Sequence, residues 1–564
     1  MKNIFILSFL LCSMCFYSCS DSEHTEKNIE MLSISKFLVK VGNSDIEGNI
    51  DQDKKVIMVM VPNGTDLKKI FVEATYTEGA TLEPSSGYSY NLSNPVDFIL
   101  SKNGASVTYK VTVAVQPEML SFEVGQYYKK AMIENDIIKI QFSYGTDLTK
   151  ITPTIRLASG CNIEPASDTE VNLSGEFSYT VTNSAGNSKL YKVQASVLPQ
   201  EKQVRGVWVP DPSHTTVLHN YKNLKEFINL LDELNINAIY LATWVREMTL
   251  FKSSVLKNNT NYATIEDGWL LNGLNYDGPT NDPIKDLLAL AHAKDMKVFF
   301  WFEYGFMRSG GESPSADHPI LSTHPEWDGI NSFGKAANYN STDYYLNSYN
   351  PEVQEFIISL IEEAIDMYPE VDGIQGDDRL PAAPRNSGYN ESTKLLYKQQ
   401  TGKEVPVNYE DSQWVKWRLQ NLNEFGEKMY TRIKNKKNTI LVASSPNPYP
   451  WCVENLMQDW PTWLKKNTVD LLSVQCYRET VSAYMNTLNE AVKYVKGNTD
   501  KNILNPGIYL RNTSEWEDIF VGQMTINRDN NINGEAFFYN EGLKREVNKK
   551  VIKGFYTGKA IFPF

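Results

Sequence analysis

From residue 204 onward, the chain alternates short apolar runs with longer segments of helical periodicity. Between these runs, five segments place apolar residues at every third or fourth position, as an amphipathic helix does. Eight buried strands with helical crossovers predict a (β/α)8 TIM barrel over residues 204–564, within a multidomain chain. A doubly wound open sheet is the alternative, but it usually has fewer strands. The eight apolar runs are RGVWVP from 205, INAIYLATW from 236, KVFFWFEY from 297, VDGIQGDD from 371, TILVASSP from 439, DLLSVQCY from 470, NPGIYL from 505 and GEAFFYNE from 534.

Before residue 200, the chain carries one pattern twice. GTDLKKI at 64–70 returns as GTDLTKI at 145–151, and GATLEP at 79–84 returns as GCNIEP at 160–165. Alternating runs such as VIMVMV and IIKIQF, separated by turn residues, predict two antiparallel β-sandwich repeats, at 31–116 and 117–198. They resemble the immunoglobulin-like modules of surface lipoproteins. Because no Trp precedes residue 205, we expect spacers here and not a sugar-stacking platform.

The amino-terminal segment predicts export. An apolar run from Ile4 to Tyr17 is shorter than the roughly 20 residues that span a membrane, so it predicts a signal peptide over residues 1–18. Ser18-Cys19 resembles the lipobox of bacterial lipoproteins, and the SDSE that follows resembles the surface-export tag of Bacteroidetes lipoproteins. These resemblances imply lipidation of Cys19, a linker over 19–30, and a secreted outer-membrane lipoprotein at the cell surface. An unlipidated secretory signal is the alternative.

Charge and composition exclude several classes of partner. A formal net charge of −13 argues against nucleic acid, and against membrane binding other than by the lipid anchor. Cys161, Cys452 and Cys476 are too widely spaced for a disulfide framework or a zinc site, so we expect buried free thiols. The six His residues are scattered, and His318 and His324 lie in a Pro- and Ser-containing loop where a solvated role is expected. We predict no metal and no cofactor, and the oligomeric state stays open.

The segment VDGIQGDDRLP, residues 371–381, places two adjacent carboxylates where an apolar strand stops. In a barrel, catalytic groups lie at the carboxyl ends of the strands. Alternation puts Asp377 on the face opposite Ile374, so Asp377 points into the barrel mouth if Ile374 packs against the helices. Asp378 can orient Asp377 or begin the next loop. The alternative is that Asp378 caps that loop and pairs with Arg379.

Five separated segments resemble the glycosyl hydrolase-like 10 family of bacterial barrel proteins. They are VRGVWVP, TWVREMTLFKSSV, VDGIQGDDRLP, QDWPTWLKKNTVDLLSVQCY and GEAFFYNEGL, in this order over about residues 204–550. The resemblance implies a glycoside hydrolase that acts on polysaccharide, with the carboxylates after the fourth strand at its centre. DGIQGD is also similar to the D-G-x-R-x-D of several barrel glycosidases, in which the last Asp attacks the sugar. Arg379 stands where the family commonly has an aromatic residue.

Glycoside cleavage needs one group that protonates the leaving oxygen and one carboxylate that attacks carbon or activates water. We expect Asp377 to take the second role. The acid is left open among the other carboxyl groups at strand ends: Asp378, Glu303, Glu479 and Glu541. The alternative for each is an ion pair with a nearby arginine: Arg246, Arg379, Arg478 or Arg511.

A sugar site also predicts aromatic and polar side chains near the mouth, because aromatic rings suit the C–H faces of sugars and polar groups bind hydroxyls. For each of them the alternative is burial in the core or a hydrogen bond to loop backbone. The aromatic candidates are Trp208, Trp244, Trp301, Tyr304, Tyr449, Trp451 and Tyr477, and the polar candidates are His214, Arg246, Arg379, Ser445, Asn447, Gln475 and Arg511.

The sequence therefore predicts a surface lipoprotein whose barrel hydrolyses the glycosidic bonds of a poly- or oligosaccharide. Two alternatives from other classes remain. One is a non-catalytic glycan-binding lipoprotein on the same barrel. The other is a structural or adhesive envelope protein, in which the Trp residues are buried and no sugar binds.

Overall fold

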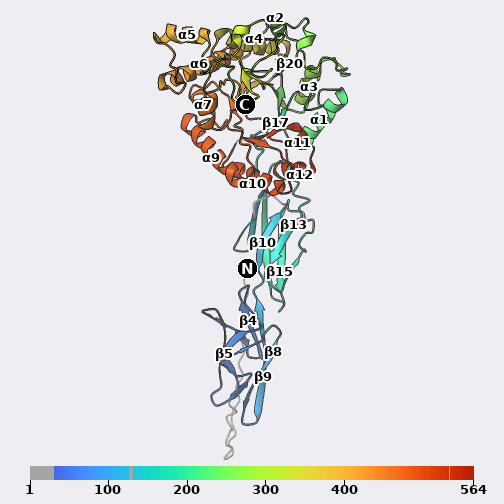
Figure 1. The fold of residues 1–564 in the computed structure, drawn as a ribbon. Helices are drawn as coiled ribbons and strands as arrows, with labels where there is room; N and C mark the ends of the chain where they lie inside the picture. Colours follow the sequence, from blue (N-terminus) through green and yellow to red (C-terminus); the bar gives the residue numbers. More distant parts are fainter. Residues whose placement is uncertain (1–30, 126–130, 533) are drawn as a thin grey trace, which may run out of the picture. The chain divides into compact units, whose positions relative to one another are not determined.

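The structure is a computed structural model that describes residues 31–125, 131–532 and 534–564. The predicted signal peptide, Cys19 and the linker to residue 30 lie outside these residues. The described chain is all-β up to β16 (Ser188–Val197), and from β17 (Val204–Val209) onward strands alternate with helices (Figure 1). Among the described residues, contacts between Cα atoms group 191–564 with 121–155 and 167–178 in one compact unit, and 31–120 with 156–166 and 179–190 in a second.

The first repeat forms two β-sheets. The sequence VIMVMV of β4 (Val56–Val61) buries every second side chain, as expected of a strand with one face on a core. Phe37, Phe98 and Tyr109 are fully buried in that core. One sheet has the order β2 (Ser44–Glu47), β1 (Ile34–Val41), β5 (Ile70–Tyr76), β7 (Tyr88–Tyr90), and the other has the order β3 (Asn49–Asp51), β4, β9 (Ala105–Val115), β8 (Val96–Lys102), β6 (Thr81–Glu83).

The second repeat follows the same strand order in a shorter form. One sheet pairs β10 (Met119–Val124) with β13 (Pro153–Leu157), and the other has the order β11 (Met132–Glu134), β12 (Ile137–Phe142), β16, β15 (Phe177–Asn183), β14 (Cys161–Glu164). In both repeats one pair is parallel, β4 with β9 and β12 with β16. The prediction of antiparallel sandwiches therefore holds for other strand pairs but is wrong for these two. A parallel pair needs a crossover, and β5 in the other sheet lies within the connection from β4 to β9.

The eight predicted strands after residue 204 form one parallel sheet. The end strands of this sheet are joined by parallel bridges from Leu472 to Leu504 and from Gln475 to Gly507, so the sheet curls back on itself. This arrangement is consistent with a TIM-like barrel. The strand order is β26 (Leu471–Leu472), β25 (Leu441–Ser444), β24 (Gly373–Gly376), β21 (Lys297–Phe302), β18 (Ala238–Ala242), β17, β28 (Gly534–Phe538), β27 (Gly507–Tyr509).

Alternate residues of these strands belong to two different cores. Trp208, Tyr240 and Phe299 cluster with small residues inside the sheet, whereas Val207 and Ile239 pack in the larger core with the helices. Burial on both faces explains why the strands read as continuous apolar runs.

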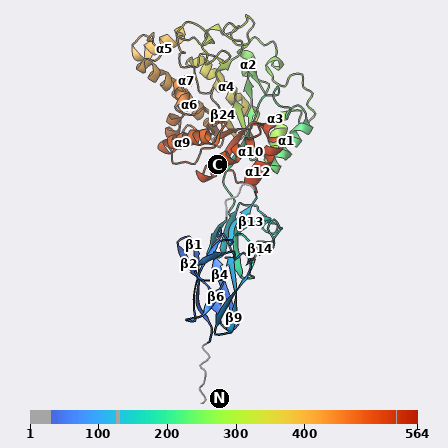
Figure 2. The same ribbon diagram turned by 60° about the horizontal axis from the view of Figure 1, so that its bottom comes forward.

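All five predicted helices are present, and Figure 2 shows helices around the strand β24. They are α1 (Tyr221–Glu233), α3 (Pro283–His292), α4 (Pro351–Met367), α6 (Ser412–Lys436) and α9 (Val481–Asn498). Three further helices of at least ten residues were not predicted: α5 (Glu391–Thr401), α10 (Trp516–Asp529) and α12 (Glu546–Phe555). Of the helices in the described part of the chain, none has the length and apolar character needed to cross a bilayer.

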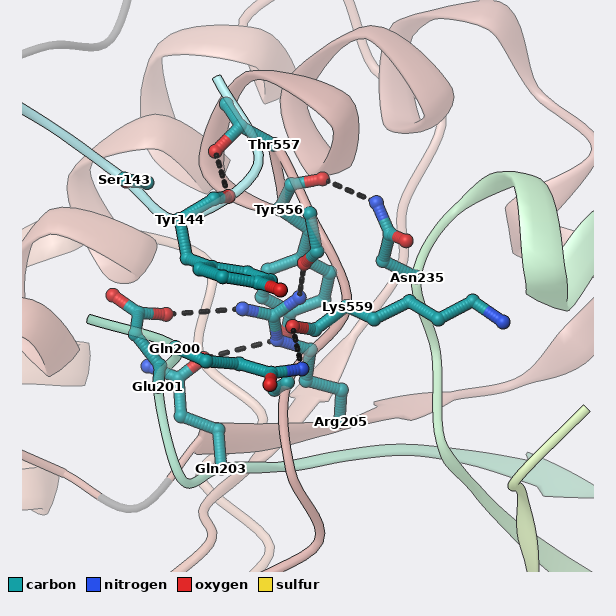
Figure 3. A network of polar contacts seen from close by, with 12 residues as sticks. Ser143, Tyr144, Gln200, Glu201, Gln203, Arg205, Asn235, Tyr556, Thr557 and Lys559 are labelled. Atoms are coloured by element: carbon teal, nitrogen blue, oxygen red, sulfur yellow. Dashed lines mark hydrogen bonds and ion pairs between the residues drawn. The ribbon is translucent and has the colours of Figure 1, made fainter. Parts of the chain in front are cut away.

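A polar network lies near the beginning of β17 (Figure 3). The Arg205 guanidinium donates to Gln203 Oε1 at 2.9 Å, to Glu201 Oε2 at 3.0 Å and to the Gly558 carbonyl at 2.6 Å. It also stacks 4.0 Å from the centre of the Tyr556 ring. This network ties the first strand of the parallel sheet to the carboxyl-terminal segment.

Candidate active site

The end of β24 places the two aspartates as the alternation of the strand predicts. Ile374 packs in the core shared with the helices, and Gln375 accepts a 2.8 Å hydrogen bond from Trp208 Nε1 inside the sheet. Asp377 follows on the inner side, where Trp301 Nε1 donates to its Oδ2 atom at 3.2 Å.

Asp377 is almost completely enclosed, with 1% of the residue exposed. Its Oδ1 accepts the Arg379 backbone N–H at 2.9 Å, and its Oδ2 accepts Arg379 Nη1 at 2.9 Å in addition to Trp301. Burial raises the pKa of Asp377 above its ordinary value, and the Arg379 guanidinium acts in the opposite direction. Both oxygens of this carboxyl group are therefore occupied by protein donors.

Asp378 has a more open environment, with 21% of its side chain exposed. Its Oδ1 accepts Arg379 Nη1 at 3.1 Å and Gln475 Nε2 at 3.3 Å. Its Oδ2 accepts Asn447 Nδ2 at 3.1 Å. Donors from three strand ends thus hold the Asp378 carboxylate.

Glu303, the residue after β21, has a buried Oε2 atom without a hydrogen-bond partner among the described residues. Burial raises the pKa of Glu303 to about 7, while the charge of Arg379 lowers it and the charges of Asp211 and Asp378 raise it. Arg379 Nη1 also lies 3.3 Å from the Glu303 carbonyl oxygen. Glu303 is thus a buried carboxyl group with one unpartnered oxygen, and its charge acts on both aspartates.

A second polar group lies beyond β17 and was not predicted as a unit. Asp211 accepts Arg246 Nη2 at 2.8 Å and Ser213 Oγ at 2.5 Å on Oδ1, and its Oδ2 lies 2.8 Å from His214 Nδ1. The Tyr304 ring lies 5.9 Å from the Arg379 guanidinium. Asp211 itself was missed, although its place two residues after a strand could have indicated it.

Two family models match parts of the chain. The family model described as "Glycosyl hydrolase-like 10" matches residues 203–509. The chain belongs to the glycosyl hydrolase-like 10 family. A second model, described as "SGBP, N-terminal", matches residues 34–113 and 119–195, which are the two all-β repeats.

Curated relatives of this glycosyl hydrolase-like 10 protein are named glycosyl hydrolase DigH, from Escherichia coli (strain K12) and Shigella flexneri. Each is 25% identical over 227 residues, which cover 38% of this chain and 45% of the relative. The match therefore spans less than half the length of these relatives. Among solved structures, an endo-1,4-β-D-mannanase from Thermotoga petrophila RKU-1 is 12% identical, with a TM-score of 0.35, over 60% of this chain and 88% of that chain. A β-galactosidase from Rahnella sp. R3 is 10% identical, with a TM-score of 0.42, over 64% and 57%.

Several predicted site residues of this glycosyl hydrolase-like 10 domain lie apart from the aspartates. Trp244 is buried among the helices, donates to the Gly305 carbonyl at 2.9 Å and packs on Phe356. Glu479 is 76% exposed and pairs with Arg511 at 3.0 Å, which is the ion-pair alternative. Glu541 accepts Thr215 Oγ1 at 2.9 Å and pairs with Lys544.

The remaining candidates divide between the core and the surface. Ser445 is buried, and its carbonyl accepts Gln475 Nε2 at 2.9 Å. Tyr449 packs on Trp460 and Tyr494, and Tyr477 packs on Tyr509 and Phe538. Trp451 is exposed. Sequence reasoning also missed Gln458, which donates to the Asp377 carbonyl at 2.7 Å and carries no recognisable sequence signal.

Two expectations about titratable residues need correction. His318 is not solvated: it is buried, and its Nε2 lies 3.3 Å from Glu247 Oε2, because the insertion after β21 packs into the core shared with the helices. Cys452 and Cys476 are buried free thiols as predicted, but Cys161 is only half-buried. Within residues 31–125, 131–532 and 534–564, no group of three or more His, Cys, Asp or Glu could hold a metal ion.

Proposed function

We propose that the chain is a glycoside hydrolase that cleaves O-glycosidic bonds of a poly- or oligosaccharide at the carboxyl ends of a closed (β/α)8 barrel. Family membership supports the reaction class. One observation carries the proposal. Glu303 has a carboxyl oxygen without a protein partner, and it lies within electrostatic reach of the group formed by Asp377, Asp378 and Arg379.

Glu303 is proposed as the general acid. An acid must hold its proton near the working pH, and burial raises the pKa of Glu303 to about 7. Its Oε2 is buried without a protein partner, so no protein hydrogen bond competes for the proton that the leaving oxygen would receive. No cofactor takes part in this scheme.

Asp378 is proposed as the carboxylate that attacks the sugar or activates water. Asp377 was expected to attack the sugar, but both of its carboxyl oxygens accept hydrogen bonds from Arg379 and only 1% of the residue is exposed, so it is not proposed for this role. Asp377 is instead proposed to hold Arg379 in place, and Arg379 in turn orients Asp378. Asn447 and Gln475 position the same carboxylate.

We propose the predicted domain boundaries as well: sandwiches of immunoglobulin-like type at 31–116 and 117–198, and the barrel at 204–564. SGBP denotes a surface glycan-binding protein, so the amino-terminal match supports a place at the cell surface. We propose the lipid anchor at Cys19 from the sequence alone. The same match favours the second candidate function, a glycan-binding surface lipoprotein that does not cut its ligand.

The test is release of reducing ends from a panel of cell-wall, plant and host glycans by residues 20–564 and by single variants. We expect Glu303→Gln to lower the hydrolysis rate by about 10²–10⁴-fold, as loss of a general acid does. Glu479→Gln, at another strand end but exposed, is the matched control and should retain the rate. No release from any glycan, with binding of one of them intact in all three proteins, would establish the binding function instead.

Single substitutions to asparagine distinguish the proposed roles of Asp377 and Asp378. Asp378→Asn should abolish release, because an amide cannot attack, and should keep the thermal midpoint of the parent. Asp377→Asn leaves the half-buried Arg379 with one carboxyl partner fewer and should lower the midpoint together with activity. If Asp378→Asn cuts glycans as well as the parent does, while Asp377→Asn is folded and inactive, the attacking role returns to Asp377.

A further inference from the structure

Two exposed aromatic side chains touch each other outside the carboxylate group. Trp451 is 38% exposed and Tyr339 is 42% exposed. Their rings meet edge to face, with centroids 5.5 Å apart and planes at 87°. A single exposed apolar residue needs no explanation, but a contacting pair that stays in water keeps apolar area uncovered at a cost, which suggests a binding surface.

Trp451 is close to the candidate active site along the chain. It begins α7 (Trp451–Leu456), in the loop after β25, four residues beyond Asn447. Asn447 donates to Asp378 Oδ2 at 3.1 Å. Four residues span at most about 14 Å, so the Cα atom of Trp451 lies within that distance of the Cα atom of Asn447.

Tyr339 reaches the same rim from the insertion after β21. Its backbone N–H donates to the Asp343 carbonyl at 3.0 Å, in a turn that ends at β23 (Tyr344–Tyr345). β23 pairs with β22 (Met307–Arg308), and the preceding Phe306 N–H donates to the Arg379 carbonyl at 3.2 Å. Both rings are thus attached to loops that contact the Asp378–Arg379 segment.

We propose that Tyr339 and Trp451 form a sugar-stacking subsite, the Tyr339–Trp451 platform, for a distal unit of a glycan chain bound at the carboxylates. This inference rests on the proposed function and adds that the ligand is an oligosaccharide of several units. Indole and phenol rings cover the C–H faces of a sugar and keep a polar edge for its hydroxyls.

The neighbours of the platform favour a sugar over a protein partner. Exposed residues next to it in sequence are Asn340, Ser341, Thr342 and Glu454, which offer amide, hydroxyl and carboxylate groups. A protein interface of useful size has a fully buried apolar core, and no large aliphatic side chain is exposed in these two loops.

The test compares ligand length. In the Glu303→Gln background, which keeps the ligand intact, calorimetry measures binding of the biose and hexaose of the cello-, manno-, xylo- and chito-series. We expect at least one hexaose to bind more tightly than its biose. Trp451→Ala should weaken hexaose binding about tenfold without changing biose binding, Tyr339→Ala should have a smaller effect, and Trp451→Phe should restore most of the affinity.

Phe333→Ala is the matched control, because Phe333 is 73% exposed in the same insertion and should not alter binding. Equal hexaose binding by parent, Trp451→Ala and Tyr339→Ala would overturn the platform, even if the protein cuts glycans. Loss of hexaose binding in Trp451→Ala, in a protein whose parent cuts no glycan, would support the platform and reject the hydrolase. A parent that binds none of these ligands overturns the platform as a subsite for them.

Discussion

Asp377 and Asp378 are adjacent in sequence but have different surroundings, because successive side chains leave a strand in opposite directions. Asp377 turns inward under Trp301 and is covered, whereas Asp378 reaches donors from the loops after β25 and β26. Two adjacent carboxyl groups are accommodated there because Arg379 Nη1 contacts both, at 2.9 Å and 3.1 Å. Arg379 thus has a structural role beside the carboxylates.

The pH dependence of hydrolysis tests the protonation of Glu303. Burial raises the pKa of this carboxyl group to about 7, so the proton is held below that pH and lost above it. If Glu303 is the acid, the rate should fall about tenfold per pH unit above roughly pH 7. The measurement is the hydrolysis rate from pH 5 to pH 9 on whichever glycan is cut.

Glu247→Gln is the control for this profile, since Glu247 is also buried with a pKa near 7 but lies outside the carboxylate group. The control should keep the alkaline fall in rate. A profile of the parent that stays flat to pH 9 would remove Glu303 from the role of acid.

Alternation of side chains along a strand predicts the inward direction of Asp377 correctly, but it gives the wrong direction for Trp244. Along β18, Ala238, Tyr240 and Ala242 face inward, so simple alternation would also turn Trp244 inward. The strand ends at Ala242, however, and Trp244 begins the hairpin strand β19 (Trp244–Val245), which directs its ring among the helices. Where a strand ends cannot be read from the apolar run itself, because the run continues into the loop.

The hairpin of β19 and β20 (Met248–Thr249) is an element that the sequence did not predict. Its two turn residues, Arg246 and Glu247, have φ values of 48° and 59°, a left-handed conformation that such turns usually assign to Asn and Gly. Each costs on the order of 1 kcal/mol. The cost is offset by the contacts that the turn makes, since Arg246 reaches Asp211 and Glu247 accepts Ser309 Oγ at 2.6 Å.

Glu247 should make the stability of this element depend on pH. Burial raises its pKa from 4.5 to about 7, against hydrogen bonding from Ser309 and the charge of Arg308. The folded protein therefore keeps a proton that the unfolded chain releases. The resulting stabilisation is complete below about pH 4.5 and is lost as the pH rises through about 7, a change on the order of 3 kcal/mol.

The measurement is urea unfolding at pH 5 and pH 8 for the parent and for Glu247→Gln, whose side chain does not titrate. The parent should lose more stability between the two pH values than the variant. Glu326→Gln, a change in an exposed carboxylate of the same insertion, should behave as the parent does. An identical pH dependence in the parent and Glu247→Gln would show that Glu247 is ionised throughout.

Across the whole molecule, the eight strands and five main helices could be predicted because each carries a regular apolar period. The pattern Trp516, Phe520, Met524 recurs every four residues and could have identified α10 as well. The barrel prediction included closure, but the pairing that joins the two end strands could not be derived from the sequence, since β26 and β27 have only two and three residues and one partner of each joining bridge, Leu504 or Gln475, lies outside them. Pairing across such short strands depends on contacts far apart in the sequence.

A buried charge network joins β28 to neighbouring helical and carboxyl-terminal residues. Glu535 in β28 is fully buried and accepts both Arg528 Nη1, at 2.9 Å, and Arg528 Nη2, at 2.8 Å, together with the hydroxyl of Tyr556. The Tyr556 ring is also the one that stacks on Arg205 in Figure 3. Burial alone would raise the pKa of Glu535, but its bonds with Arg528 bring the pKa below the ordinary value. The carboxylate is therefore charged, and it joins β28 to α10 and to the carboxyl-terminal segment.

Glu535→Gln should destabilise the parallel sheet and its helices by about 3–5 kcal/mol, because it removes the fully buried partner of Arg528, whose own side chain is only 19% exposed. Glu201→Gln is the matched control: Glu201 also pairs with an arginine of this network but is partly exposed, so its loss should cost about 1 kcal/mol or less. Every Trp of the chain lies at or beyond residue 208, so Trp fluorescence during urea unfolding reports on this region alone. If both variants unfold within about 1 kcal/mol of the parent, the sheet is held closed by apolar packing, and the charge network contributes little to its stability.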